Sequence, residues 1–447
     1  MSRFSRQLGI AALVAIVFAG SAAAQLLPAL PLPSLPATGP IGNLPVAGPI
    51  LQDVLSQPQA QQVIAPTLDT VSGLPDSIAE SGAPNLLQLR KMRLDRLVRD
   101  NRQFLEADDK GDPVRRGILV AADPDPLSLQ LASAAGFRVI GTDSEPDLGL
   151  SSVELSVPNG MAVTKALRLL HKVVPGLSAD YDPVYQPAGG GLRPLGGALA
   201  SSAAIAAGAT GRTIGMIDGG VASHPSLAGA HIEQNGFAGA PRPTGHGTAI
   251  ASLLVGNQGP FHGAATGAQL YVADVYGGNQ AAGSATAIVR ALGWLATHHP
   301  QVITISLVGP SNTLVQRAIQ AVQARGIEVV AAVGNDGPAA PPQYPASYPR
   351  VVAVTGVDAR GRALVEAGRA THLDFAAPGA DMAAALPGQG YARVRGTSFA
   401  APLAAARLLA DGSVARLAAE ARPGKGRVGR GIVCGECRTD PRSVGAK

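Results

Sequence analysis

The stretch QVITISLVGPSNTLVQRAIQAVQARGIEVVAAVGN, residues 301–335, indicates the fold class of the second half of the chain. It begins and ends with short, continuous apolar runs, and a segment of helical length separates them. Apolar runs without alternation, joined by a helix, are typical of parallel strands buried on both faces of an α/β sheet. Comparable runs recur at residues 213–218 (TIGMID) and 269–277 (QLYVADVYG). We therefore expect an α/β domain in which helices cover both faces of a parallel sheet.

Polar residues stand where such runs end or where the next helix begins. Asp218 closes the run TIGMI, His246 opens an apolar stretch, and Ser398 opens a helix rich in small residues. Functional groups of parallel α/β sheets gather beyond the carboxyl ends of the strands. A serine hydroxyl needs a base to take its proton, and a carboxylate can orient a histidine that acts as this base. The three residue types therefore match nucleophilic catalysis.

Asn335, at the end of the last apolar run, adds a fourth polar group. Its side-chain amide could donate a hydrogen bond to a developing oxyanion, beside the unpaired N–H of Ser398 at a helix start. Taken singly, these residues also fit plain structural roles, since Asp before two glycines is typical of a turn and Ser of a helix cap. Their combination favours a catalytic site.

The four residues lie in the blocks IGMIDGG, GHGTAIAS, AAVGND and GTSFAAP, in the order Asp, His, Asn, Ser. Through these blocks the chain resembles the subtilisin-like serine proteases over about residues 205–410. An α/β-hydrolase would need another order and a G-x-S-x-G block. The resemblance implies a subtilisin-like three-layer α/β fold and a serine endopeptidase. In it Ser398 attacks, His246 transfers the proton, Asp218 orients His246, and Asn335 helps to bind the oxyanion.

The resemblance also implies where the substrate binds. The rim of the primary pocket is expected from Ser306, Leu307, Gly309, Ala332 and Gly334. Asp336 would favour a basic side chain in this pocket, whereas Tyr185, at the expected self-cleavage point, would favour a large apolar one. Both alternatives stay open on the sequence alone.

The N-terminus has the pattern of a secretory signal peptide. Arg3 and Arg6 precede an apolar stretch at residues 8–19, and small residues follow. About 12 apolar residues are too few for a spanning helix, which needs about 20. We therefore assign residues 1–24 to a signal peptide and expect a secreted protein, either extracellular or periplasmic. A membrane-tethered protein is the alternative if the signal is not cleaved.

The next segments differ in character. Residues 25–85 are rich in proline and poor in charge, and we expect a flexible leader. Residues 86–116 show helical spacing of leucines, which predicts an amphipathic helix and a linker. Residues 117–186 follow the pattern β-α-β-β-α-β, which predicts a ferredoxin-like α+β module.

By resemblance, this module is a propeptide, which in secreted subtilases assists folding and blocks the cleft with its C-terminal tail. A glycine-rich joint follows the module directly. We therefore expect a zymogen that cleaves itself within a few residues of Tyr185. The catalytic domain is expected at residues 187–412 and a C-terminal extension at residues 413–447.

The composition excludes other classes of protein. A content of 46% hydrophobic residues is sufficient for a large core and excludes a wholly disordered chain. A net charge of +5 with 4% aromatic residues does not match the basic, aromatic surfaces of nucleic-acid-binding proteins. The expected partners are protein or peptide substrates and the chain's own propeptide, with no nucleic acid, no membrane after signal cleavage, and a monomeric enzyme. A secreted binding protein that kept the fold without turnover is the alternative, but the intact catalytic residues argue against it.

Three features depart from the family pattern. Gly219 stands where Ser or Thr commonly follows the catalytic Asp. The loop at residues 254–263 is short and offers Asn257 but no carboxylate, which argues against a structural calcium site. The tail after Ala410 has no clear closing helix, although residues 426–433 (GRVGRGIV) resemble the family's last glycine-rich strand. We expect no cofactor and no metal.

The chain has two cysteines, Cys434 and Cys437. Their spacing fits a small local disulfide or half of a zinc site, but no second Cys/His pair lies nearby in the sequence. An oxidising compartment favours the disulfide.

Overall fold

The structure is a computed structural model that describes residues 83–189, 191–194, 209–388 and 390–445. The expected signal peptide and almost all of the expected leader lie outside the described residues. Within the described ranges, no helix combines the length and the apolar character that a membrane span requires.

A seven-stranded parallel sheet organises the C-terminal part of the chain, in the order β17-β16-β15-β13-β8-β12-β9. Its strands are β8 (Thr213–Asp218), β9 (His231–Gly236), β12 (Gln269–Asp274), β13 (Val302–Ile305), β15 (Glu328–Ala332), β16 (Val352–Val357) and β17 (Phe375–Pro378). Most of these strands are fully buried, because helices cover both faces of the sheet.

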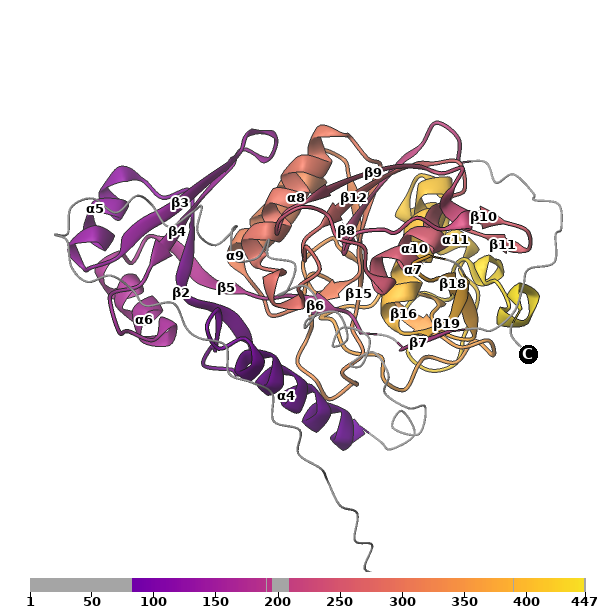
Figure 1. Ribbon diagram of the computed structural model, residues 1–447, viewed down its shortest axis with the longest axis horizontal. Helices are drawn as coiled ribbons and strands as arrows, with labels where there is room; N and C mark the ends of the chain where they lie inside the picture. The colour runs from indigo at the N-terminus through magenta and orange to yellow at the C-terminus, as the bar shows by residue number, and fades with distance from the viewer. Residues whose placement is uncertain (1–82, 190, 195–208, 389, 446–447) are drawn as a thin grey trace, which may run out of the picture. The chain divides into compact units, whose positions relative to one another are not determined.

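Two pairs of helices form the outer layers (Figure 1). Helices α7 (Gly245–Val255) and α10 (Thr397–Asp411) cover one face, and α8 (Ala285–Thr297) and α9 (Thr313–Ala324) cover the other. Strand β15 shows the division, since Val330 joins the core on the α7 and α10 side while Val329 and Ala331 join the core on the other side. The predicted three-layer α/β fold is confirmed.

The N-terminal module contains an antiparallel sheet in the order β3-β4-β2-β5. Its elements are β2 (Pro113–Ala122), α5 (Pro126–Ala134), β3 (Arg138–Glu145), β4 (Leu150–Ser156), α6 (Val163–Val173) and β5 (Ser178–Pro183). This is the ferredoxin-like topology expected for residues 117–186. A short strand that was not expected, β1 (Leu105–Ala107), pairs with the start of β2.

The two faces of this smaller sheet have different partners. Leu119 and Leu155 pack under α5 and α6. Val120 and Ala122 point to the opposite face and join the core that contains α8 and α9. The module is therefore packed on both faces, and its second face is buried against the catalytic domain.

Helix α4 (Ala83–Asp100) precedes the module and agrees with the expected amphipathic helix. Leu86 and Leu94 are buried, whereas Met92 is exposed. Buried apolar side chains at helical spacing show that one face of this helix packs against the rest of the protein.

The C-terminal extension corrects two sequence interpretations. Helix α11 (Val414–Glu420) begins after Ser413, whose side chain accepts a hydrogen bond from Arg416 N–H, although the sequence showed no clear closing helix. Residues 426–433 form no regular strand, and Ile432 makes isolated bridges to Ala376 and Arg422. Positive φ angles at Gly429 and Gly431 break the extended backbone that a strand needs.

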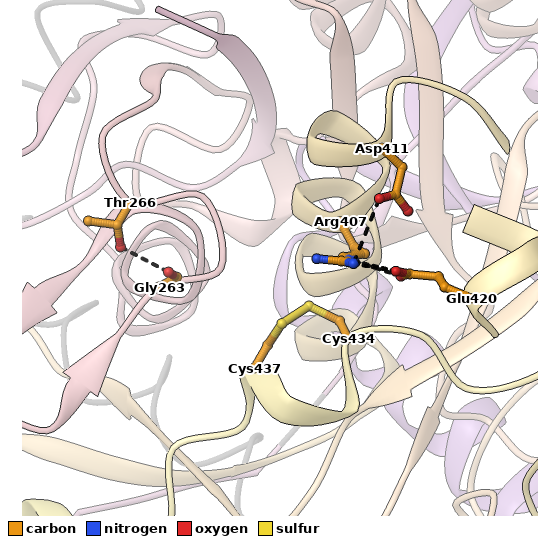
Figure 2. The surroundings of a disulfide bond; sticks show 7 residues. All are labelled: Gly263, Thr266, Arg407, Asp411, Glu420, Cys434 and Cys437. Carbon is orange, nitrogen blue, oxygen red and sulfur yellow. Dashed lines mark hydrogen bonds and ion pairs between the residues drawn. A yellow bond between two sulfur atoms is a disulfide. The ribbon is translucent and has the colours of Figure 1, made fainter. Parts of the chain in front are cut away.

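A disulfide between Cys434 and Cys437 closes the tail, so the zinc alternative is wrong. Figure 2 shows this disulfide beside α10, whose Arg407 pairs with Glu420 of α11; Arg407 Nε lies 2.7 Å from Glu420 Oε1. Leu417 and Val433 belong to the same core as α10. The extension is therefore packed onto the catalytic domain.

Candidate active site

The site begins with a carboxylate and an imidazole at neighbouring element ends. Asp218 is the last residue of β8 and is fully buried, and His246 is the second residue of α7. His246 Nδ1 lies 2.9 Å from both carboxylate oxygens of Asp218. The carboxylate thus fixes the orientation of the ring and makes Nδ1 the protonated nitrogen.

The start of α7 is held against the turn after β8. Thr244 caps the helix by accepting a hydrogen bond from Gly247 N–H at 2.9 Å, and its own N–H donates to Gly220 O at 2.9 Å. A Cβ on Gly219 would lie 2.4 Å from Thr244 Oγ1, so a side chain does not fit there. The departure at Gly219 is therefore explained by the space that Thr244 occupies.

The other ring nitrogen, His246 Nε2, is buried and has no hydrogen-bond partner among the described residues. An unpaired buried polar atom is rare, because its desolvation costs about 1–3 kcal/mol. The imidazole ring lies 5.3 Å from the ring of Phe399, the residue after Ser398. Nε2 is thus available to take a proton near the start of α10.

Ser398 is the second residue of α10, and its hydroxyl donates to Gly189 O at 3.2 Å. Asn335 Nδ2 donates to the carbonyl oxygens of Ala188 and Gly189, and Asn335 Oδ1 accepts from Thr397 N–H at 3.0 Å. Ser398 and Asn335 therefore meet at the peptide that joins residues 188 and 189. The structure shows no hydrogen bond between Ser398 and His246.

The segment before that peptide lies in the cleft as an added strand. Strand β6 (Gln186–Pro187) pairs antiparallel with β14 (Leu307–Val308). Ala188 N–H donates to Ser306 O at 2.8 Å, and Tyr185 N–H donates to Gly283 O at 2.7 Å. Backbone pairing of this kind is how an extended peptide binds to an exposed strand, with side-chain pockets adding selectivity.

Three of the expected substrate-binding residues contact this segment. Ser306 and Leu307 pair with its backbone, and a Cβ on Gly309 would lie 2.6 Å from the Tyr185 ring. Gly334 lies beside Asn335, and a Cβ on it would lie 3.2 Å from Val308 Cγ1 and 3.4 Å from Gln343 Cγ. Val308 and Gln343 therefore pack beside Gly334. Ala332 is buried in the same apolar cluster as Ala188 and Val308.

Tyr185 occupies a pocket that the sequence did not reveal. The side chain is fully buried, and its hydroxyl donates to Pro310 O at 3.0 Å. Tyr276 O–H donates to the backbone oxygen of Tyr185 at 3.2 Å. Burial raises the pKa of the Tyr185 hydroxyl well above its ordinary value. The pocket therefore holds a neutral tyrosine and binds its ring and its hydroxyl.

Asp274 is a second buried carboxylate that the sequence analysis missed. It ends β12 in register with Asp218. Its oxygens accept hydrogen bonds from the N–H groups of Arg242 at 2.8 Å, Tyr276 at 2.8 Å and Gly277 at 3.0 Å. Burial raises the pKa of Asp274, and these N–H groups oppose the rise. Asp274 thus fixes two loops, one leading to α7 and one carrying Tyr276.

Among the described residues, no group of three or more His, Cys, Asp or Glu side chains could hold a metal ion. In the loop where the family binds calcium, the Asn257 side chain is 2.9 Å from His262 Nδ1 and is engaged there.

Comparison with known proteins places these residues in a family. The model of the subtilase family matches residues 209–410. Over 198 residues the chain is 32% identical to subtilisin Savinase of Lederbergia lenta, covering 43% of this chain and 73% of Savinase. It is also 32% identical over 198 residues to the alkaline protease of Alkalihalobacillus alcalophilus, covering 43% of this chain and 52% of that protein.

Among solved structures, the fold is similar to that of fervidolysin from Fervidobacterium pennivorans, described as a keratinolytic enzyme related to subtilisin. The TM-score is 0.60 at 17% identity, over 75% of this chain and 62% of fervidolysin. At this level of identity the likeness concerns the fold alone. With the sequence matches above, the chain belongs to the subtilase family and is a serine-type endopeptidase.

Proposed function

We propose that the chain is the zymogen of a secreted endopeptidase and that it first cleaves itself between Ala188 and Gly189. The position of Ala188 in the cleft is the observation that supports this proposal. Its N–H donates to Ser306 O at 2.8 Å, and its carbonyl oxygen accepts from Asn335 Nδ2. The Ser398 hydroxyl lies at the adjacent Gly189. The segment thus occupies the cleft as a substrate would, with the carbonyl oxygens of Ala188 and Gly189 both on the amide donor of Asn335.

The proposed mechanism assigns one task to each of these groups. His246 Nε2 takes the proton of Ser398 Oγ as this oxygen bonds to the carbonyl carbon of Ala188, and Asp218 stabilises the imidazolium that forms. Asn335 Nδ2 and the Ser398 N–H bind the oxyanion. The C–N bond to Gly189 then breaks, and His246 donates the proton to the departing amine. Water, deprotonated by His246, hydrolyses the resulting acyl-enzyme and frees Ser398.

One adjustment precedes the first step. The Ser398 hydroxyl donates to Gly189 O and must turn to His246 Nε2 instead. Such hydrogen bonds are often long or misdirected before the reactive complex forms. We propose that rotation about the Ser398 Cα–Cβ bond exchanges one acceptor for the other. The free Nε2 makes this exchange favourable, because it satisfies a buried polar atom.

The same segment supports a proposal for substrate selectivity. Tyr185, at the fourth position before the scissile bond, is enclosed in a pocket, while Ala188, directly before that bond, is 2% exposed and packs in the same apolar cluster as Val308. We therefore expect peptides with tyrosine at the fourth position before the cleaved bond and a small residue directly before it. Asp336 does not support selectivity for a basic side chain directly before the cleaved bond, because in the uncleaved chain its carboxylate already pairs with Arg90 and Arg93.

The N-terminal module supports the role of an inhibitor that remains after cleavage. Asp182 Oδ1 accepts from Thr286 N–H at 3.2 Å at the start of α8, and Asp180 Oδ2 accepts from Thr313 N–H at 3.1 Å at the start of α9. Carboxylates at helix N-termini are stabilised by the unpaired N–H groups and the helix dipole. These caps hold the module on the catalytic domain independently of the scissile bond.

Export is the remaining part of the proposal. The basic and apolar pattern of residues 1–24 supports it, and so does the Cys434–Cys437 disulfide, because disulfides persist in oxidising compartments.

The decisive experiment for the activity is Ser398→Ala. The variant should stay uncleaved, with the circular dichroism of the folded zymogen, while the wild type separates into two fragments. A serine-directed organophosphate should label the processed wild type at Ser398. Self-cleavage by the Ser398→Ala chain would refute the mechanism.

A further inference from the structure

Helix α4 contacts the catalytic domain in the loop that follows Asn335, through Asp336 and Gly337. We infer that α4 is a separate inhibitory anchor, docked through Arg90 and Arg93 on Asp336, and that it delays release of the N-terminal segment after self-cleavage. This inference rests on the proposed cleavage at Ala188. The docking surface belongs to the catalytic domain, and its occupant is residues 83–100 of the same chain.

Asp336 lies between two guanidinium groups of α4. Arg93 Nη2 donates to Asp336 Oδ1 at 2.8 Å, and Arg90 Nε lies 3.2 Å from Asp336 Oδ2. The side chain of Asp336 is 6% exposed, that of Arg90 is 14% exposed and that of Arg93 is 32% exposed, so the pair with Arg90 is the better shielded of the two. Ion pairs shielded from water in this way keep much of their attraction, unlike pairs on an open surface.

Arg90 also joins α4 to the module. Its Nη2 donates to Asp112 Oδ1 at 2.7 Å, just before strand β2. Asp112, Arg90, Asp336 and Arg93 therefore form one network with two negative and two positive charges. Removing the arginines would leave Asp336 buried and uncompensated, which is strongly unfavourable for the docked state.

Apolar contacts complete the docking surface. Gly337, directly after Asp336, faces Leu86, and a Cβ on it would lie 2.9 Å from Leu86 Cδ1. Leu94 lines the same small cavity as Val308 and Gln343 of the catalytic domain. The helix thus covers the loop that follows Asn335 with both charge and apolar area.

The geometry has a kinetic consequence. After cleavage at Ala188, the N-terminal segment is held by three separate contacts: the strand in the cleft, the module on α8 and α9, and α4 on Asp336. Contacts on one chain reinforce each other because each keeps the others at a high local concentration. Loss of the α4 contact should therefore speed dissociation without changing the chemistry of cleavage.

The test uses the full chain with Arg90→Gln and Arg93→Gln together. Two times are measured in each sample: the appearance of the cleaved fragments on a gel, and the later appearance of activity on an added fluorogenic peptide. We expect an unchanged cleavage rate and a lag between the two events that is at least about tenfold shorter. Added salt should shorten the lag of the wild type more than that of the double variant.

Arg96→Gln is the matched control, because Arg96 lies on the same helix and, within the part of the chain that the structure describes, its ion-pair partner is the exposed Asp100. Its lag should equal that of the wild type. An unchanged lag in the double variant, with normal self-cleavage, would overturn the inference and leave the proposed function intact. A lag shortened equally by Arg96→Gln would also overturn the inference, because the net positive charge of α4, and not the specific pairs with Asp336, would then account for the slow release. If the wild type never cleaves itself, the proposed function fails instead.

Discussion

The two ends of the segment in the cleft are held in different ways. At one end the Tyr185 side chain is fully enclosed, with its ring against Gly309 and its hydroxyl on Pro310 O. At the other end Ala188 offers only a methyl group, but its backbone contacts Ser306 and Asn335. The comparison separates two tasks: the Tyr185 end supplies binding energy, and the Ala188 end supplies the reactive geometry.

This division has a physical reason. Interactions far from the scissile bond can hold the reacting carbonyl in place, whereas only groups that bind the transition state better than the substrate lower the barrier. Variants at the Ala188 end should therefore change kcat for every substrate. Variants at the Tyr185 end should change the preference among substrates.

The largest effect is expected from Asp218→Asn. The amide would favour the wrong tautomer of His246 and would not stabilise the imidazolium, so kcat should fall by about 10⁴-fold, as in other serine proteases. Burst kinetics with an active-site titrant would measure it. A loss of less than tenfold would show that the 2.9 Å contacts to His246 are not part of the catalytic machinery.

Asn335→Ala should have the next largest effect. It removes the amide that contacts Ala188 O, and kcat should fall by about 10²- to 10³-fold, the range known for this donor in subtilisin. KM for a tyrosine-containing peptide should change little, because the Tyr185 pocket is untouched. A rise in KM with unchanged kcat would contradict the role of Asn335 at the Ala188 end.

Gly309→Ala tests the Tyr185 end. The new Cβ would lie 2.6 Å from the tyrosine ring, so the pocket should no longer accept it. For peptides with tyrosine at the fourth position before the cleaved bond, kcat/KM should fall by about 10- to 100-fold, which is the contribution of a buried aromatic side chain. The matched peptide with alanine at that position is the control and should be cleaved as by the wild type. An equal loss of kcat/KM for both peptides would contradict the assignment of substrate selectivity to the Tyr185 end.

The smallest effect concerns the module outside the cleft. Burial at the contact with Gly293 of α8 raises the pKa of Glu145 to about 7, Asp143 acts in the same direction, and Arg290 opposes both. The carboxyl group of Glu145 therefore binds its proton more tightly in the docked state than in the released state, in which the pKa of Glu145 returns toward 4.5. Docking should be strongest below about pH 4.5 and weaken as the pH rises to about 7.

Glu145→Gln should remove this part of the pH dependence and slow the release of the cleaved segment a few-fold at pH 8. The effect is small because the carboxyl is partly exposed and solvent screens its interactions. The lag between self-cleavage and the appearance of activity, measured from pH 5 to pH 8 for the variant and the wild type, would show this change in release. If the variant and the wild type have the same pH profile, Glu145 does not contribute to docking.

The sequence indicated the residues of the site because each lies in a local block at a strand or helix end. Parallel strands bring such ends to one edge, so Asp218 and His246 could be expected to meet although 28 residues separate them. The free Nε2 and the hydrogen bond from Ser398 to Gly189 could not be predicted, because they depend on how the segment before residue 190 enters the cleft.

Other features depend on contacts between distant segments. The tyrosine pocket combines Gly283, Gly309 and Pro310, none of which has a distinctive local pattern. The contact of Arg93 with Asp336 joins residues 243 positions apart. Periodicity and propensity describe neighbours along the chain, so they carry no signal for either feature.

The most direct test of the account is the mass of the two fragments produced when the purified wild-type chain cleaves itself. We predict one fragment that ends at Ala188 and one that begins at Gly189, and neither in the Ser398→Ala chain. Fragments that meet at any other bond, or a wild-type chain that stays whole while it hydrolyses peptides, would contradict the claim that Ala188 is seated as the first substrate.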